Sequence, residues 1–208
     1  KIIILDPKPK FSKQALFQEG WQKHYSGMVE WLGPDVHGGI ANVNPETMEI
    51  ETDLDTFRAD AATVIPGQKA GAIAFAAGVT DGDWVPIDPV SMTSKANADI
   101  YVLGDATVAS AMPKSGFSAN SQAKVAANAI RGELTGSKVF PARYANTCWS
   151  LIADNDGVKV GASYKPGDSK IDAVDTFISH TGEDEALRKA TYEESEGWYT
   201  SITQDMFS

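Results

Sequence analysis

The chain of 208 residues has little of several features that would direct a functional assignment. It contains one cysteine, Cys148, so it cannot form a disulfide within itself. Its three histidines, His24, His37 and His180, lack the spacing of metal ligands, and we expect no metal. No apolar run approaches the ~20 residues of a membrane helix, so we expect no membrane span. No Gly-x-Gly-x-x-Gly phosphate loop occurs either.

Basic residues are also scarce. The 18 Lys and Arg stand against 28 Asp and Glu, and the net charge is −10. Because phosphate contacts need clustered Lys and Arg, we expect no nucleic-acid partner. The acidic charge either steers a basic partner or only maintains solubility. The length of 208 residues indicates one large or two small domains, and a hydrophobic content of 42% is typical of a globular protein.

The first six residues, Lys1 to Asp6, indicate a buried strand that ends in an acidic residue. In a dinucleotide-binding βαβ unit the second strand often ends this way, and the acid holds a ribose; alternatively, Asp6 is structural. The Gly-rich turn of such a unit would lie about 20 residues earlier, before residue 1. Since the chain starts inside a strand and shows no signal peptide, we expect a fragment or a processed product.

The stretch from Ala98 to Arg131 organises the rest of the chain. Ile100–Leu103 is short, apolar and β-rich, which predicts a buried strand that stops at Gly104-Asp105. A loop of small residues follows, and alanines spaced by three and four predict a helix from about Phe117. A carboxylate after a buried strand can accept bonds from ligand hydroxyls, and a helix N-terminus can stabilise an anion. The alternative is a plain turn and a helix that only covers the sheet.

The remaining elements are predicted from the hydrophobic periodicity and from the positions of Gly and Pro. A helix with Ser12 as its N-cap is predicted up to Tyr25. Other predicted elements are strands near 36–43, 48–52, 57–64 and 157–164, a short Ala-rich helix at 70–77, a linker at 132–141 and a polar helix beginning at Thr181 or Glu183.

Several short motifs, in order from one end to the other, carry a family resemblance. They are KIIILD at 1–6, FSKQ at 11–14, the strand with Gly104-Asp105, MPKSGFSANSQ at 112–122, NTC at 146–148 and Trp198-Tyr199. The strand with Gly-Asp resembles the second FAD-binding motif of the flavoprotein disulfide reductases. Together the motifs resemble the flavoprotein subunit of flavocytochrome c sulfide dehydrogenase.

The resemblance implies FAD as the cofactor and assigns roles to residues. Gly104 and Asp105 would bind the ribityl chain. The turn of Lys114, Ser115, Gly116 and Phe117 would point at the flavin pyrimidine edge, where Lys114 favours the anionic reduced flavin; a solvated loop lysine is the alternative. The loop of Gln68 would lie near the flavin, or it is only a Pro-Gly turn.

Cys148 and Trp198 are the implied catalytic residues. A lone cysteine in an apolar segment is usually a small buried hydrophobe. By resemblance, Cys148 is one member of a redox-active pair beside the flavin, and the other member lies in the absent amino-terminal half. Trp198 would shield the flavin face from water, or it belongs to the core.

The implied fold is α/β: part of a protein with two dinucleotide-binding (Rossmann-like) domains, plus a small α+β carboxyl-terminal interface domain. Residues 1–66 would complete the second, NADH-like domain, residues 67–138 would close the FAD domain, and residues 139–208 would form the interface domain. The 208 residues alone are expected to hold FAD weakly and to be inactive, because both phosphate loops are missing.

The implied activity is FAD-dependent oxidation of sulfide to sulfur or polysulfide in the periplasm. The electrons would pass to a c-type cytochrome, with haem c on a separate subunit. Two alternatives remain open: an enzyme like sulfide:quinone oxidoreductase, and a non-catalytic flavin-fold binding protein. An NADH-dependent disulfide reductase is disfavoured, since its usual His-Glu pair is not found.

Overall fold

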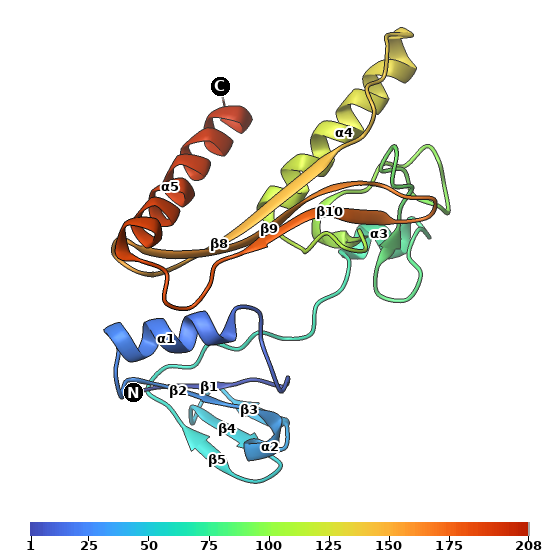
Figure 1. Cartoon of the computed structure of the whole chain (residues 1–208). Coiled ribbons are helices and arrows are strands. Elements are labelled where there is room, and N and C mark those ends of the chain that lie inside the picture. Colours follow the sequence, from blue (N-terminus) through green and yellow to red (C-terminus); the bar gives the residue numbers. More distant parts are fainter. Residues whose placement is uncertain (208) are drawn as a thin grey trace.

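The structure, a computed structural model, describes residues 1–207 and has a mixed α/β architecture. The first region forms the lower part of Figure 1. Strands β1 (Ile2–Leu5) and β2 (Val29–Leu32) pair in parallel and are joined by helix α1 (Gln14–His24), which makes a βαβ unit. Ile2 and Ile3 of β1 are exposed, so the predicted burial of this strand is wrong. The short helix α2 (Pro34–His37) follows, and the strand predicted near 36–43 begins only at Ile40. An antiparallel sheet completes the region with β3 (Ile40–Asn44), β4 (Glu49–Thr52) and β5 (Thr56–Arg58).

The start of helix α1 differs from the prediction. Ser12 is not the N-cap: the helix begins at Gln14, and the cap position is Lys13, whose φ of 62° is left-handed. A left-handed lysine is strained, and tertiary contacts must hold it there. The Lys13 ammonium supplies such contacts, because it donates to the backbone oxygen of Cys148 at 3.0 Å.

The middle region is poor in regular structure. It holds helix α3 (Ala72–Ala76), a parallel pair of two-residue strands, β6 (Val85–Pro86) and β7 (Thr107–Val108), and a 3-10 turn, η1 (Gly104–Ala106). The strand predicted at Ile100–Leu103 is wrong. Within residues 1–207 it forms one bridge, between Tyr101 and Thr93, and a buried strand needs neighbours on both edges.

Helix α4 (Gly116–Thr135) is the helix predicted from the alanine spacing, and it runs into the predicted linker. The residues that flank this helix explain where it begins and where it ends. The Ser115 side chain accepts a hydrogen bond from the Ser118 backbone N–H, which is an N-cap. At the other end Gly136 adopts a left-handed φ of 66° and its N–H bonds to the Gly132 oxygen.

The last region is a long antiparallel sheet with a helix. Strands β8 (Tyr144–Ala153), β9 (Asp156–Pro166) and β10 (Ile171–Ile178) lie in the order β10-β9-β8. Figure 1 shows α4 and helix α5 (Glu185–Phe207) on one side of this sheet and α1 on the other. Gly157 of β9 allows the close approach of α5, because a Cβ there would lie 2.8 Å from the Tyr192 nitrogen.

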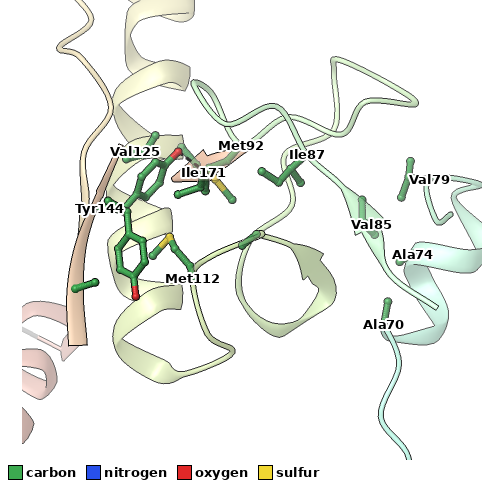
Figure 2. Packing of buried hydrophobic residues seen from close by; sticks show 14 residues of the cluster. Ala70, Ala74, Val79, Val85, Ile87, Met92, Met112, Val125, Tyr144 and Ile171 are labelled. Carbon is green, nitrogen blue, oxygen red and sulfur yellow. Dashed lines mark hydrogen bonds between the residues drawn. The ribbon is translucent and has the colours of Figure 1, made fainter. Parts of the chain in front are cut away.

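The main core joins the middle region to this sheet. Figure 2 shows Tyr144 and Ile171, from β8 and β10, among Met92, Met112 and Val125 of the middle region. The Tyr144 hydroxyl donates to the Pro89 oxygen at 2.6 Å inside this core. A smaller cluster of Leu16, Ile152 and Val158 packs α1 against β8 and β9. The long sheet is therefore packed against both other regions.

Candidate functional site

The Gly104-Asp105 turn is tied to helix α4 by its backbone. Gly104 has a left-handed φ of 72°, and its N–H donates to the side-chain oxygen of Gln122 at 2.7 Å. Gln122 is buried, so this bond fixes the turn from inside. The Asp105 side chain is exposed and makes no hydrogen bond within residues 1–207. Its carboxylate is therefore free to accept from a ligand.

Lys114 holds the same turn from the outside. Its ammonium donates to the backbone oxygens of Asp105 and Thr107, the latter at 2.8 Å, and lies 3.6 Å from the centre of the Trp84 ring. Burial lowers the pKa of Lys114, and the negative charge of Asp105 acts in the opposite direction. The lysine closes one side of a cavity of about 180 Å³ that Trp84, Val108 and Met112 also line.

The N-terminus of α4 carries the other predicted residues of this turn. Ser115 is the N-cap, and a Cβ on Gly116 would lie 3.8 Å from Trp198. Ser118, one turn further, is only 1% exposed, and its hydroxyl has no partner in the part of the chain described here. An unpartnered buried hydroxyl is unusual in a folded protein.

Cys148 lies on β8 and is half-buried. Its sulfur accepts a hydrogen bond from the Asn146 side-chain nitrogen at 3.2 Å. Asn146 in turn accepts from the Ser115 hydroxyl, so the cysteine and the N-terminus of α4 are connected through one buried amide. The structure thereby brings together two predicted residues, Ser115 and Cys148, that are 33 positions apart in the chain.

Lys13 approaches the same strand. Its ammonium donates to the Cys148 backbone oxygen at 3.0 Å and to the Ser150 hydroxyl at 2.7 Å. Burial lowers the pKa of Lys13, and the nearby Cys148 acts to raise it. Burial also raises the pKa of the Tyr164 phenol, and Cys148 adds to that rise.

Trp198 belongs to an aromatic cluster at the start of α4. Its ring centre lies 5.6 Å from Phe117 and 5.6 Å from Trp149, and Phe117 stacks on Trp149 at 6.1 Å. Trp149 also donates to Glu194 of α5 at 3.3 Å. These rings connect α4, β8 and α5. Because Trp149 is adjacent to Cys148 in β8, the ring cluster and the cysteine side chain lie on opposite faces of that strand.

Gln68 stands apart from the other predicted residues. It lies in the exposed segment 61–69, and its side chain donates to the Pro66 oxygen within its own turn at 3.0 Å. In residues 1–207 it makes no hydrogen bond to another predicted site residue. Its flavin contact stays a prediction.

Sequence reasoning missed Asn146 and Lys13. One signal for Asn146 was present: in a strand, positions two apart share a face, so the amide of Asn146 had to lie beside Cys148. Lys13 had no such signal, because it is 135 positions away from the strand it contacts.

Neither a group of potential metal ligands nor a membrane-spanning helix is found among the described residues 1–207. No cluster of three His, Cys, Asp or Glu is placed to hold a metal ion. No helix of this part is long and apolar enough to cross a membrane.

Two family models match the chain, and both describe one protein. Residues 1–66 match the central region of the sulfide dehydrogenase [flavocytochrome c] flavoprotein chain, and residues 140–207 match the flavin-binding region of flavocytochrome c sulphide dehydrogenase. The chain belongs to the flavocytochrome c sulfide dehydrogenase flavoprotein family. The resemblance seen in the short sequence motifs is confirmed.

The flavin-binding match supports FAD as the cofactor of this family member. The residues present fit such a group: Asp105 offers an exposed carboxylate that makes no hydrogen bond within residues 1–207, and the N-terminus of α4 offers backbone N–H groups. Both groups lie on the stretch from Ala98 to Arg131 that the sequence singled out.

The chain is also similar to a solved structure of a different assembly. A chain of the cryo-EM structure of the Tetrahymena thermophila mitochondrial ATP synthase, an F1Fo composite tetramer model, superimposes with a TM-score of 0.56 at 19% identity. The match covers 77% of the present chain and 40% of that chain. At this identity the likeness concerns the fold alone.

Proposed function

We propose that this chain supplies part of a flavoprotein that oxidises sulfide with FAD and a cysteine pair and gives the electrons to a c-type cytochrome subunit. The observation that carries the proposal is the connection of Cys148 to the N-terminus of α4 through Asn146. It joins Cys148 and the helix end that we propose binds the flavin in one polar network. The family matches support the substrate and the acceptor.

The reaction needs a second cysteine from outside these 208 residues, since Cys148 is the single cysteine here. Hydrosulfide attacks the disulfide of the pair: the S–S bond breaks, a new S–S bond forms to the incoming sulfur, and one cysteine leaves as a thiolate. Oxidation of one sulfide to the level of elemental sulfur releases two electrons. FAD held by Asp105 and the N-terminus of α4 would supply the capacity to take up two electrons and to release them one at a time.

The residues of this chain have separate tasks in that scheme. Cys148 provides one sulfur of the pair. Asp105 binds hydroxyls of the cofactor, and the N-terminus of α4 at Ser115–Ser118 stabilises negative charge on it. Lys114 holds the turn that presents Asp105, and Trp198 with its aromatic neighbours excludes water.

We further propose the domain limits and the location. Residues 1–66 end an NADH-like dinucleotide-binding domain, residues 67–138 close the FAD domain, and residues 139–208 form the interface domain. The βαβ unit of β1, α1 and β2 and the parallel pair of β6 and β7 support this division. A periplasmic location agrees with a c-type cytochrome as the acceptor.

An anaerobic sulfide titration of the flavoprotein that contains this chain tests the proposal. We expect sulfide to bleach the flavin absorbance and cytochrome c, but not a quinone analogue, to restore it. Cys148→Ser should abolish the bleaching, because the disulfide can no longer form. The matched control is Ser163→Ala, an exposed serine of the adjacent strand β9.

Other outcomes would point to the alternatives. Reoxidation by the quinone analogue would favour an enzyme like sulfide:quinone oxidoreductase. A Cys148→Ser protein with unchanged bleaching would refute the role of the cysteine. A flavin that never responds to sulfide would favour a binding protein without this activity.

A further inference from the structure

A directed series of hydrogen bonds ends on the sulfur of Cys148. The Ser118 backbone N–H donates to the Ser115 hydroxyl oxygen at 3.1 Å, and the Ser115 hydroxyl donates to the side-chain oxygen of Asn146. The Asn146 side-chain nitrogen then donates to Cys148 Sγ at 3.2 Å. Each group accepts from the helix side and donates toward the cysteine.

This series fixes the orientation of the Asn146 amide. Asn146 is 2% exposed, so water does not compete for its polar atoms. Its oxygen is occupied by the Ser115 hydroxyl, which leaves the NH₂ group directed at the sulfur. A neutral thiol is a weak acceptor, whereas a thiolate is a strong one, so the arrangement favours negative charge on Cys148.

The series also begins at a source of positive potential. The N-terminus of a helix carries about half a positive charge, and α4 is a 20-residue helix. Hydrogen bonds that all run in one direction polarise one another, which strengthens the last donor. A second positive group, the Lys13 ammonium, is bound at the backbone oxygen of Cys148. Both features stabilise a charged sulfur.

We propose that Asn146 is a positioning residue that stabilises the thiolate of Cys148 by connecting it to the N-terminus of α4 through Ser115. The role of this thiolate rests on the proposed function. When hydrosulfide attacks the partner cysteine of the pair, the S–S bond breaks and its electron pair goes to Cys148. The incoming sulfur becomes bonded to the partner cysteine, and its proton passes to solvent. The Asn146 donor stabilises the negative charge that forms on the leaving sulfur, so Cys148 is the leaving sulfur.

The thiol pKa of Cys148 can be measured without sulfide chemistry. The reduced flavoprotein with its FAD is treated with pulses of iodoacetamide over a pH series around the ordinary thiol pKa of about 8.5. The peptide that contains Cys148 is then quantified by mass spectrometry. Asn146→Asp keeps the size of the side chain but replaces the donor by a carboxylate oxygen. We expect it to raise the alkylation midpoint by about one to two pH units.

Two further variants separate this role from a structural one. Ser115→Ala leaves Asn146 in place but frees its amide, and we expect a smaller rise of the midpoint. Ser121→Ala is the matched control: its hydroxyl accepts from the Ala145 N–H at 3.0 Å, at the same contact of α4 with β8, but does not reach Cys148. We expect no change of its midpoint. If Asn146→Asp loses its native circular dichroism, Ser115→Ala decides the question.

The proposal would be overturned if Asn146→Asp had the same alkylation midpoint as the parent protein. If Asn146→Asp does not fold, the same result for Ser115→Ala would overturn it. The proposed function fails separately. If Cys148→Ser still allows sulfide to bleach the flavin while Asn146→Asp shifts the alkylation midpoint, the function is wrong and the assignment of Asn146 stands. If Cys148→Ser abolishes bleaching and the midpoint does not move, only the assignment fails.

Discussion

Asp156→Asn tests the contact that joins helices α1 and α5 to strand β9. Asp156, at the start of β9, accepts from the Arg188 guanidinium of α5, and its second oxygen lies 2.6 Å from His24 Nε2 of α1. Only 6% of either the Asp156 or the Arg188 side chain is exposed, and 25% of His24. Glu19 of α1 lies 3.7 Å from the same arginine. Asparagine has the same shape but no charge, so it removes the ion pair and little else.

The size of the effect follows from this burial. Hydrogen bonds to charged groups contribute about 1.5 to 3 kcal/mol each, and asparagine can keep at most one of the two acceptor oxygens. It also leaves the buried Arg188 guanidinium, whose Nη1 already lacks a hydrogen bond within residues 1–207, without its main counter-charge. Removing one partner of a buried ion pair costs about 3 to 5 kcal/mol. We expect the unfolding free energy to fall by that amount.

Urea unfolding of the flavoprotein, followed by circular dichroism and tryptophan fluorescence, measures the change. Asp154→Asn is the control, because Asp154 is exposed two positions away and makes no hydrogen bond in the part of the chain described. We expect the control to stay within about 0.5 kcal/mol of the parent protein. An Asp156→Asn protein as stable as the control would refute the reasoning, because the contact would then contribute nothing.

The same carboxylate gives a dependence on pH. Burial alone would raise the pKa of Asp156, but hydrogen bonds from Arg188 and His24, with their charges, outweigh it and hold the pKa below its ordinary value of 3.8. A lowered pKa stabilises the fold above the ordinary value and loses that contribution as the pH falls through the folded-state pKa. The parent protein should therefore lose stability below about pH 4, where Asp156→Asn loses less.

Three further substitutions test the packing and a buried hydrogen bond. Gly157→Ala would place a Cβ 2.8 Å from the Tyr192 backbone nitrogen and should lower the unfolding free energy by about 1 to 3 kcal/mol. Gly197→Ala, which has open space around it in the middle of α5, should raise the unfolding free energy by up to about 1 kcal/mol, and equal effects of the two variants in thermal unfolding would contradict this. Tyr144→Phe should cost about 1 to 3 kcal/mol, because the buried Pro89 oxygen loses its donor. Burial raises the pKa of Tyr144, so the parent should lose stability above about pH 10 and Tyr144→Phe should lose less; identical alkaline urea titrations would oppose that.

Local sequence signals predicted the elements whose ends are set locally. The helix after Ser115 has its cap and its alanine spacing in the sequence, and β9 shows as an alternating run. Strand β10 was missed, because most of its side chains are exposed and no apolar pattern marks it. The strand predicted at 57–64 is correct only over Thr56–Arg58, since the residues beyond it have no strand partner within residues 1–207.

The site was predictable to the extent that it lies on one continuous stretch. Gly104, Asp105 and the turn at Ser115 could be read from residue order and family resemblance. The groups that act on Cys148 could not all be read in this way. The Ser115 hydroxyl and the Lys13 ammonium reach β8 through tertiary folding, and no local periodicity encodes a contact between residues so far apart. The same holds for Asp156 with its partners on α1 and α5.

The exposed segment 61–69 is the covalent connection between the first region and the rest of the chain. The first region is also bound to the long sheet by Leu16 against Ile152 and by the charged contact of Asp156. The orientation of α1 to the strand of Cys148 is therefore set by surfaces that meet directly and not by the segment that joins them. The length and sequence of residues 61–69 can change without moving Lys13 relative to Cys148.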